Sequence, residues 1–453
     1  MGSKVWTMDR RSLSADTGFV PQTGSLFDTA GFDQLIKPGD QVAIKIHCGE
    51  WNNTAYLRPV YARTIVDKVK ELGGRPFVTA TCTMPYAPPA ARSLAPDLML
   101  TAERNGFSSA TLGAPFIAAD GFAGTDDLRV PLPEGYILQE AFIAKAIALA
   151  DVMIVLTHFK GHPMGVIGGA IKNLGIGCQS KRGKFNVHMG RHPEYGFHNQ
   201  VTWHPENVPD GFNIHSCAHG AYSRTNGSVD WNPDECYTCL GCMGLMTASG
   251  AWELSGENFR AFNAACADGA LAVNKVLDGK IGYLNLGLDV SPYCDCVGHA
   301  DIPLTSHLGI FSGHDPVAID KACLDRATEL PGMPGSASED WGVDAPGDHK
   351  FAMAASAMPG KLGTIEHVTE EIQLNTGVEN GLGTMEYELI EVPGSGDGEE
   401  YGFSFDRRPV GERMANLYAK ENPFPKERFN GDGFDRKSKV NLDKVAGPLP
   451  SPE

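Results

Sequence analysis

Three cysteines at regular spacing constrain this chain more than any other feature. Cys236, Cys239 and Cys242 follow one another in the segment Cys-Tyr-Thr-Cys-Leu-Gly-Cys. Thiolates at such spacing are typical ligands of a metal centre, and three of them leave one place of a four-ligand centre to be filled. The pattern therefore predicts a small metal-binding segment around these three cysteines.

The segment resembles one half of a bacterial two-cluster ferredoxin. In those proteins each run reads C-x-x-C-x-x-C-x-x-x-C-P, and the fourth cysteine of one run binds the cluster of the other run. Here the second run keeps Cys236, Cys239 and Cys242 but has Met246 at its fourth place, whereas the first run keeps only Cys217. All lost ligands belong to one cluster and all retained ligands to the other. The resemblance implies one 4Fe-4S cluster bound by the four cysteines.

Two other interpretations of these cysteines stay open. Four thiolates also suit tetrahedral zinc, although zinc ribbons usually offer two separate C-x-x-C pairs rather than three consecutive cysteines. The thiols can also be buried structural residues, as cysteines often are. A separate pair, Cys294 and Cys296, forms a C-x-C motif with too few ligands to define a metal site, so its role is left open.

Composition and charge exclude several classes of protein. The chain has 453 residues, of which 42% are hydrophobic, enough for more than one core. A net charge of -17 argues against nucleic acid or an anionic membrane as a general partner. The first twenty residues lack the apolar core of a secretory signal, and the most apolar stretch, 141–159, is interrupted by Lys145 and Asp151, so no membrane span is expected.

The cysteine content indicates a compartment. Eleven cysteines without an export signal favour thiolate ligation in a reducing cytoplasm over disulfides. We therefore expect a cytoplasmic protein, and an exposed cluster would favour an anaerobic host.

Alternating apolar runs and helical patterns predict an α/β fold with a mostly parallel sheet flanked by helices. Strands are expected at 42–48, 77–82, 152–156, 281–290 and 385–392. Helices are expected at 61–72, 138–150, 261–273 and 315–323, and the helix at 138–150 is expected from its alanine content.

Four regions follow from this pattern. Residues 1–206 form the first part of the α/β core, 207–251 a ferredoxin-like insert that binds the cluster, and 252–392 the second part of the core. Residues 393–453 form a tail rich in charged residues, asparagine and proline, which cannot make a core alone. We expect this extended C-terminal tail to pack on the body or on a neighbouring subunit, so a homo-oligomer is expected.

Several long motifs carry a family resemblance. The matching stretches are 42–50 (VAIKIHCGE), 53–54, 58–59, 157–177 (THFKGHPMGVIGGAIKNLGIG), 183–184, 292–296 (PYCDC), 315–325 and 381–392 (GLGTMEYELIEV). Through them the chain resembles the uncharacterised iron-sulfur-centre proteins of domain-of-unknown-function family 362, over residues 35–392. Members of this family commonly carry two 4Fe-4S motifs, of which this chain has the ligands for one. The resemblance implies a fold and a cofactor but no reaction.

The strongest candidate pocket lies in the glycine-rich stretch 157–173, directly after an expected strand. Ligands bind at the carboxyl ends of parallel strands, where glycines let backbone N–H groups approach an anion. His158 and His162 are candidates for proton transfer, and Lys160 is a candidate catalytic cation. The predicted substrate-binding residues are Gly165, Gly168, Gly169, Lys172 and Asn173. The alternative is that the glycines serve close helix-sheet packing and the histidines are merely surface residues.

A second stretch of polar residues follows the expected strand at 42–48. Lys45 and His47 lie on one face of that strand, and Glu50 and Arg58 follow shortly after. We expect both stretches to meet in one crevice, with Lys45 and His47 in catalysis and Arg58 in binding the substrate. The alternative is a salt-bridged strand end.

Four histidines, His188, His192, His198 and His204, lie at loose spacing and are expected in a surface loop rather than in a metal site.

These observations favour an oxidoreductase or electron-transfer enzyme that acts on a small organic anion near 157–173 and exchanges electrons with a partner protein. No flavin or nicotinamide fingerprint accompanies it. Two alternatives stay open. One is a non-redox lyase or isomerase with a structural or Lewis-acid cluster, and the other is a scaffold subunit of a larger complex.

Overall fold

The computed structural model describes residues 2–12, 17–84, 91–217, 219–352, 354 and 368–394, together with 415, 420, 440 and 441. The chain divides into two compact units, Met1–Gly396 and Asp397–Glu453. Almost all of the second unit lies outside the described residues, as does nearly all of the tail predicted at 393–453. The packing expected of that tail stays a prediction. No described helix has both the length and the apolar character needed to cross a membrane.

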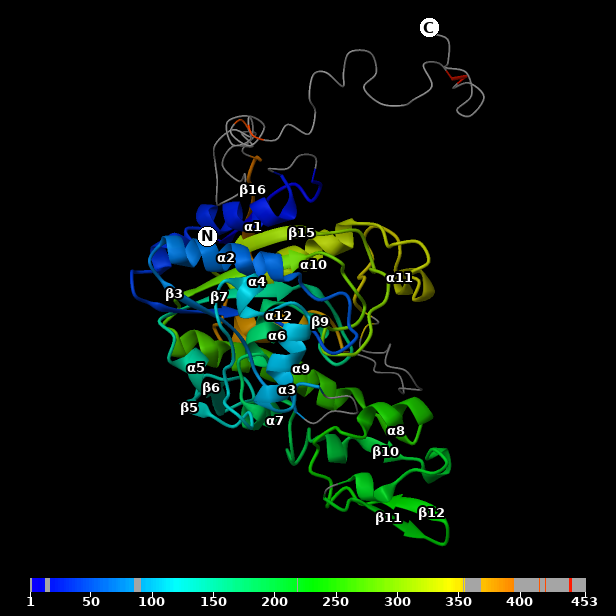
Figure 1. Cartoon of the computed structure of the whole chain (residues 1–453). Coiled ribbons are helices and arrows are strands. Elements are labelled where there is room, and N and C mark those ends of the chain that lie inside the picture. The colour runs from blue at the N-terminus through cyan, green and yellow to red at the C-terminus, as the bar shows by residue number, and fades with distance from the viewer. Residues whose placement is uncertain are drawn as a thin grey trace. The chain divides into compact units, whose positions relative to one another are not determined.

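The main element is an eight-stranded sheet in the order β16-β1-β15-β14-β7-β2-β3-β4 (Figure 1). Its strands are β1 (Ser3–Thr7), β2 (Gln41–Lys45), β3 (Arg75–Ala80), β4 (Phe116–Ala118), β7 (Val152–His158), β14 (Ile281–Gly287), β15 (Gly309–Gly313) and β16 (Tyr387–Glu391). Strand β15 is antiparallel to both of its neighbours, and every other adjacent pair is parallel. The predicted α/β fold with a mostly parallel sheet is confirmed.

Helices cover both faces of this sheet because its central strands are apolar on both sides. On β2, Ile44 packs in a core with α1 (Phe19–Thr29) and α2 (Pro59–Glu71). Its neighbour Ala43 faces the opposite core, which contains α6 (Ala170–Gly175), α9 (Gly256–Val276) and α10 (Pro316–Glu329). Further helices are η1 (Phe32–Leu35), α3 (Ala95–Arg104), α4 (Ser109–Leu112), α7 (Lys181–Val187), α11 (Ala337–Asp340) and α12 (Ile372–Glu379).

The strand order reverses direction between β2 and β7. From β2 the chain adds β3 and then β4 on one side, whereas β7 lies on the other side of β2 and is followed outward by β14 and β15. Such a reversal leaves a crevice at the carboxyl ends of the two strands, because the connections on either side lead away from it. The fold therefore places Lys45 and His158, the last residues of β2 and β7, at the position where α/β proteins bind ligands.

The cysteine-containing insert is closed at its base by two short antiparallel strands, β10 (Val201–Trp203) and β13 (Trp252–Leu254). Between them lie a hairpin of β11 (Tyr222–Thr225) and β12 (Ser228–Trp231), and the helix α8 (Met243–Ser249), which begins directly after Cys242 (Figure 1). Short 3-10 turns complete the region at η2 (Phe197–Asn199), η3 (Pro205–Asn207) and η4 (Ile214–Ser216). The aromatic and apolar residues of the insert continue the core that contains α9.

The helix predicted at 138–150 is wrong. Most of this segment is the strand β6 (Glu140–Ala144), paired antiparallel with β5 (Asp127–Pro131), and only the single turn α5 (Lys145–Ala148) is helical. The N–H of Phe142 donates to Gln179 Oε1, and Ile143 forms an isolated bridge with Gln179. These tertiary contacts outweigh the high helix propensity of the alanines, since propensity differs between ordinary residues by less than about 1 kcal/mol each.

Candidate functional site

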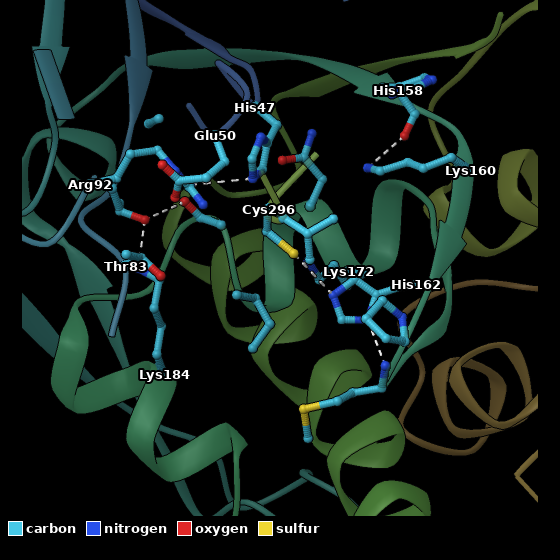
Figure 2. A pocket seen from close by; sticks show the side chains of 18 of the residues that line it. His47, Glu50, Thr83, Arg92, His158, Lys160, His162, Lys172, Lys184 and Cys296 are labelled. Atoms are coloured by element: carbon cyan, nitrogen blue, oxygen red, sulfur yellow. Dashed lines mark hydrogen bonds and ion pairs between the residues drawn. The ribbon is translucent and has the colours of Figure 1, made fainter. Parts of the chain in front are cut away.

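A cavity with a volume of about 440 Å³ lies at the carboxyl ends of β2 and β7 (Figure 2). Its wall is completed by β8 (Lys160–His162), which pairs antiparallel with β9 (Val166–Gly168), by α6 and α7, and by residues 296–299. Leu240 and Met243 of the cysteine-containing insert also line it. The site therefore lies where the reversal of strand order predicts a crevice.

Most of the residues predicted to form the site line this one cavity: Lys45, His47, His158, Lys160, His162, Gly169, Lys172 and Asn173. The two stretches are in direct contact, since Lys45 Nζ donates to Asn173 Oδ1 at 2.8 Å. Gly165, Gly168 and Arg58 are not among the lining residues. Arg58 is largely exposed, and its Nη2 lies 3.0 Å from Asp289 Oδ2. The chemical roles of these residues stay predictions.

The amino end of α6 binds a carboxylate of the protein itself. The backbone N–H groups of Ala170 and Ile171 donate to the two oxygens of Asp320, at 2.7 and 2.9 Å. Only glycine fits at position 169, because a Cβ atom there would lie 2.4 Å from that carboxylate. Burial raises the pKa of Asp320 to about 6. These two donors are therefore already satisfied, and Gly169 serves the close approach of Asp320.

We expect the Gly169→Ala substitution to lower the free energy of unfolding by about 3 kcal/mol, because the new Cβ displaces Asp320 from two charge-assisted hydrogen bonds. Urea denaturation measures the change. An Asp320→Ala background provides the control, since the methyl group then has room and the same substitution should be nearly neutral. An equal loss in both backgrounds would show that Gly169 does not act through Asp320.

Five buried cationic side chains surround the cavity: Lys45, Arg92, Lys160, Lys172 and Lys184. Figure 2 labels the last four of them. Lys45 Nζ donates to the carbonyl of Ile46 at 2.7 Å in addition to Asn173, and Lys184 Nζ donates to Thr81 Oγ1 at 2.6 Å. Within the described part of the chain, no carboxylate lies at ion-pair distance from either of these two amines. Burial lowers the pKa of Lys45 and of Lys184 to about 8.

The acidic groups near the cavity are already paired. Glu50 Oε2 accepts from Arg92 Nε at 2.9 Å. Asp295 Oδ1 lies 2.7 Å from His158 Nδ1, and Lys160 Nζ lies 3.8 Å from the other oxygen. The second ring nitrogen of His158 faces the carbonyl oxygen of Leu288 at 2.8 Å. Since both nitrogens of His158 are engaged by oxygen atoms, this side chain orients Asp295 and has no nitrogen left for a ligand.

Three histidines that line the cavity are neutral at pH 7, because burial lowers the pKa of each. His162 Nδ1 accepts the backbone N–H groups of Met164 and Gly165, and burial lowers the pKa of His162 to about 4. His188 Nδ1 donates to the carbonyl of Lys184 at 2.7 Å, and burial lowers the pKa of His188 to about 3. Burial and the charge of Arg92 also hold the pKa of His47 well below its usual value.

The expected surface loop is wrong for His188, which is buried and lines the cavity, and also for the buried His198. His188 follows Lys184 by one helical turn at the end of α7, so both side chains reach the same wall. Two sequence features could have indicated this position of His188. One is its i, i+4 spacing from Lys184, and the other is the Gly183-Lys184 pair, which is among the stretches that carry the family resemblance. Arg92 and Thr83 also line the cavity, but nothing local in the sequence indicates them.

Cys294, Cys296 and His162 present ligand atoms that all lie within 4.8 Å of one another, close enough to bind one metal ion. Cys296 Sγ lies 3.8 Å from His162 Nε2, and Lys172 Nζ lies 3.7 Å from Cys294 Sγ. Because Nδ1 of His162 accepts two N–H groups, the proton of its neutral ring is on Nε2. A metal ion at Nε2 would have to displace that proton.

A second, smaller cavity is lined by all four cysteines of the insert, Cys217, Cys236, Cys239 and Cys242. The chain thus brings the upstream cysteine to the same place as the three downstream ones. The hydroxyl of Tyr222 donates to Cys242 Sγ at 3.2 Å. Burial raises the pKa of Cys242 to about 12 and also raises the pKa of Cys236. A bound metal would reverse this effect, because it stabilises the thiolate.

The residues around this cavity fit an anionic metal centre. Thr238 and Leu240 have φ angles of 54° and 61°, in the left-handed region that non-glycine residues rarely adopt. Left-handed residues next to right-handed ones turn successive N–H groups to one side, a geometry found around iron-sulfur clusters. Thr238 Oγ1 and Trp252 Nε1 are buried, and neither has a hydrogen-bond partner among the described residues. Four thiols and unsatisfied donors suit a cluster, and the same thiols also suit zinc.

Comparison with known proteins adds a family. The family model described as Domain of unknown function (DUF362) matches residues 42–325. No curated protein matches the chain. Among solved structures, the lactate racemase apoprotein from Thermoanaerobacterium thermosaccharolyticum is similar at 10% sequence identity, with 93% of this chain and 91% of that chain covered. The TM-score of 0.34 is too low for this likeness to carry an argument about the reaction.

Proposed function

The chain belongs to the DUF362 family, and we propose that it is an iron-sulfur oxidoreductase that acts on a small organic anion in the cavity at the ends of β2 and β7. The family description assigns no reaction, so the proposal depends on the residues of the chain itself. Cys217, Cys236, Cys239 and Cys242 would hold one 4Fe-4S cluster. When bound, such a cluster supplies electrons one at a time.

The observation that carries the proposal is the excess of buried positive charge around the cavity. Lys45 and Lys184 have only neutral hydrogen-bond acceptors among the described residues, and both are almost fully buried. The charge of Asp120 offsets part of the cost of burying Lys184, whereas no described carboxylate lies at ion-pair distance from Lys45. Burial of a charge without a close counter-charge is costly, so an anion in the cavity would offset part of that cost. A cavity of about 440 Å³ is in the range that holds small organic ligands.

Neutral histidines in the wall support a catalytic role. A side chain that exchanges protons with a substrate must lie within hydrogen-bond distance of it, and His47, His162 and His188 all line the cavity. His162 Nδ1 accepts two backbone N–H groups, so its Nε2 carries the proton of the neutral ring. The cavity thus combines a proton donor with the cations that would hold the anion.

The cysteine-containing loop forms part of the substrate cavity. Leu240, between Cys239 and Cys242, lines both the large cavity and the small one. Because one residue borders both cavities, a cluster in the small cavity would lie close to the substrate in the large one. This arrangement favours a role of the cluster in the reaction over a purely structural one. A lyase or isomerase with a Lewis-acid cluster would need an open metal position, and the presence of four thiols around the small cavity argues against it.

The test is metal analysis of protein purified without oxygen, followed by electron paramagnetic resonance before and after chemical reduction. We expect about four iron and four sulfide ions per chain and one signal that responds to reduction. Zinc at one ion per chain, without sulfide, would refute the cluster. A cluster that cannot be reduced would refute the redox role and leave the lyase or isomerase.

Anion binding should depend on pH in a way that ordinary lysines would not produce. The pKa values of Lys45 and Lys184 are about 8 in the folded protein, compared with 10.5 for a free lysine. Because the charged amines hold the anion, affinity should be constant below pH 8 and fall by up to about tenfold per lysine for each pH unit above it. Calorimetric titration with succinate, whose charge is constant in this range, measures the effect. Constant affinity up to pH 10 would contradict it.

A further inference from the structure

Cys294 and Cys296 lie in one tight turn at the wall of the large cavity. The N–H of Val297 donates to the carbonyl of Cys294 at 3.1 Å, which closes the turn. The N–H of Cys296 donates to Cys294 Sγ at 3.4 Å. The two sulfur atoms lie within 4.8 Å of each other. The turn therefore keeps the two thiols side by side.

The residue between the two cysteines holds this turn in place. The carbonyl of Asp295 accepts the N–H of Glu50 at 2.8 Å, and its carboxylate is paired with His158. Cys296 is partly exposed and lines the cavity, whereas Cys294 is fully buried behind it. A ligand in the cavity can reach one sulfur, and the second sulfur can reach only the first.

The surroundings of the pair favour a thiolate. Burial alone would raise the pKa of Cys294, but the hydrogen bond from Cys296 and the charges of Lys172 and Lys160 outweigh it and lower that pKa well below the usual value. The same hydrogen bond and burial raise the pKa of Cys296. At neutral pH the pair thus holds one proton between two sulfurs, and a thiolate is the nucleophile in thiol chemistry.

The third member of this group, His162, favours thiol chemistry over metal binding. Its Nδ1 is saturated by two backbone N–H groups, so the nitrogen that faces Cys296 Sγ carries a proton. An N–H group stabilises a thiolate and can protonate a departing one, whereas it cannot ligate a metal ion. The same three side chains therefore suit a dithiol with a hydrogen-bond donor.

We propose that Cys294 and Cys296 are a redox-active dithiol that reduces an organic disulfide bearing carboxylate or phosphate groups, bound in the cavity. The anionic character of this substrate rests on the proposed function. The dithiol itself does not, because it follows from the turn that holds the two sulfurs together and from the partial exposure of Cys296. It also supplies a two-electron carrier, which a chain without a flavin or nicotinamide fingerprint otherwise lacks.

The reaction balances without another reactant. The shared proton moves from Cys296 to Cys294 Sγ, and the Cys296 thiolate attacks one sulfur of the substrate disulfide R–S–S–R′. The S–S bond breaks, and the first product leaves as the thiol R′SH with the proton taken from Cys294, which becomes a thiolate again. The thiolate of Cys294 then attacks the Cys296–S–S–R bond, which forms the Cys294–Cys296 disulfide and releases RS⁻. Two electrons pass from the dithiol to the substrate. A thiol reductant returns the pair to its reduced form by the reverse exchange.

The test is the reaction of the reduced full-length protein with 3,3′-dithiodipropionate, a small dicarboxylate disulfide, and peptide mass mapping after alkylation. We expect a Cys294–Cys296 disulfide in the wild-type chain, with a transient mixed disulfide on Cys296. The Cys294→Ser chain should accumulate that mixed disulfide, and the Cys296→Ser chain should form neither. A Cys266→Ser chain, altered at a buried cysteine of α9 that lines neither cavity, is the matched control and should react as the wild type does.

The charge of the substrate is tested with cystamine, a disulfide of similar size with two positive charges. We expect it to react at least about tenfold more slowly with the pair than the dicarboxylate does, because of the cations in the wall. Equal rates, with the disulfide still formed, would overturn the anionic substrate and with it the proposed function. Succinate binding without any Cys294–Cys296 disulfide would overturn the dithiol alone. A metal ion bound through these two sulfurs in the purified protein would also overturn it.

Discussion

The Cys217→Ser protein is expected to purify with almost none of the iron and sulfide of the wild-type chain. Cys217 lies 19 positions before the other three cysteines but lines the same small cavity, so its loss removes one of four thiolates. A cubane cluster with one cysteine missing is exposed to solvent and exchange at that corner. We expect the loss to match that of Cys239→Ser when iron and sulfide are counted after purification without oxygen.

The control for this experiment is Cys266→Ala. This cysteine is buried in α9 and lines neither cavity, so its removal should leave the iron content unchanged. Retention of iron by Cys217→Ser, together with its loss from Cys239→Ser, would show that the fourth ligand is a different group.

The Lys45→Met protein is expected to bind succinate about 10- to 100-fold more weakly than the wild type, the range expected for loss of one charge-assisted hydrogen bond. Lys45 Nζ lies in the wall between β2 and α6, and methionine keeps the length of the side chain without its charge. Calorimetric titration at pH 7 measures the change. Lys275→Met, at an exposed lysine on α9 paired with Glu134, is the matched control and should bind as the wild type does.

The same Lys45→Met substitution should raise stability at pH 7, although it weakens binding. Burial lowers the pKa of Lys45 from 10.5 to about 8, which corresponds to a cost of about 3 kcal/mol for keeping it charged in the folded state. Loss of its two neutral hydrogen bonds offsets about half of that gain. Between pH 8 and 10.5 the folded chain binds fewer protons than the unfolded chain, so wild-type stability rises and the advantage of methionine disappears.

Urea denaturation at pH 7 and pH 10.5 measures this difference. Lower stability of Lys45→Met at pH 7 would mean that a counter-charge already compensates Lys45, and the main argument for an anion site would fail.

Sequence patterns predicted the fold because its central strands are short runs of branched apolar residues separated by helical repeats. They also predicted that Lys45 and His162 would line one crevice, since the stretches that contain them lie at the carboxyl ends of two strands of a parallel sheet. The fourth cysteine was assigned through the resemblance to a two-cluster ferredoxin, and the structure places it around the same cavity as the other three.

The features that sequence missed depend on distant partners. Asp320 satisfies the amino end of α6 from 150 positions away, so the glycines before that helix indicated an open anion site. Arg92 reaches the cavity through its pair with Glu50, and no local pattern marks it. The alanine-rich segment at 138–150 followed its contacts with Gln179 instead of its own helix preference.

Leu240 has a practical consequence for any search for the natural ligand. This residue lines both the small cavity with the four cysteines and the large cavity with Lys45. If the small cavity holds the proposed cluster, loss of the cluster in air would remove the support of loop 236–242 and so change one wall of the large cavity. Ligand screens should therefore use protein that was purified without oxygen and whose iron content has been measured.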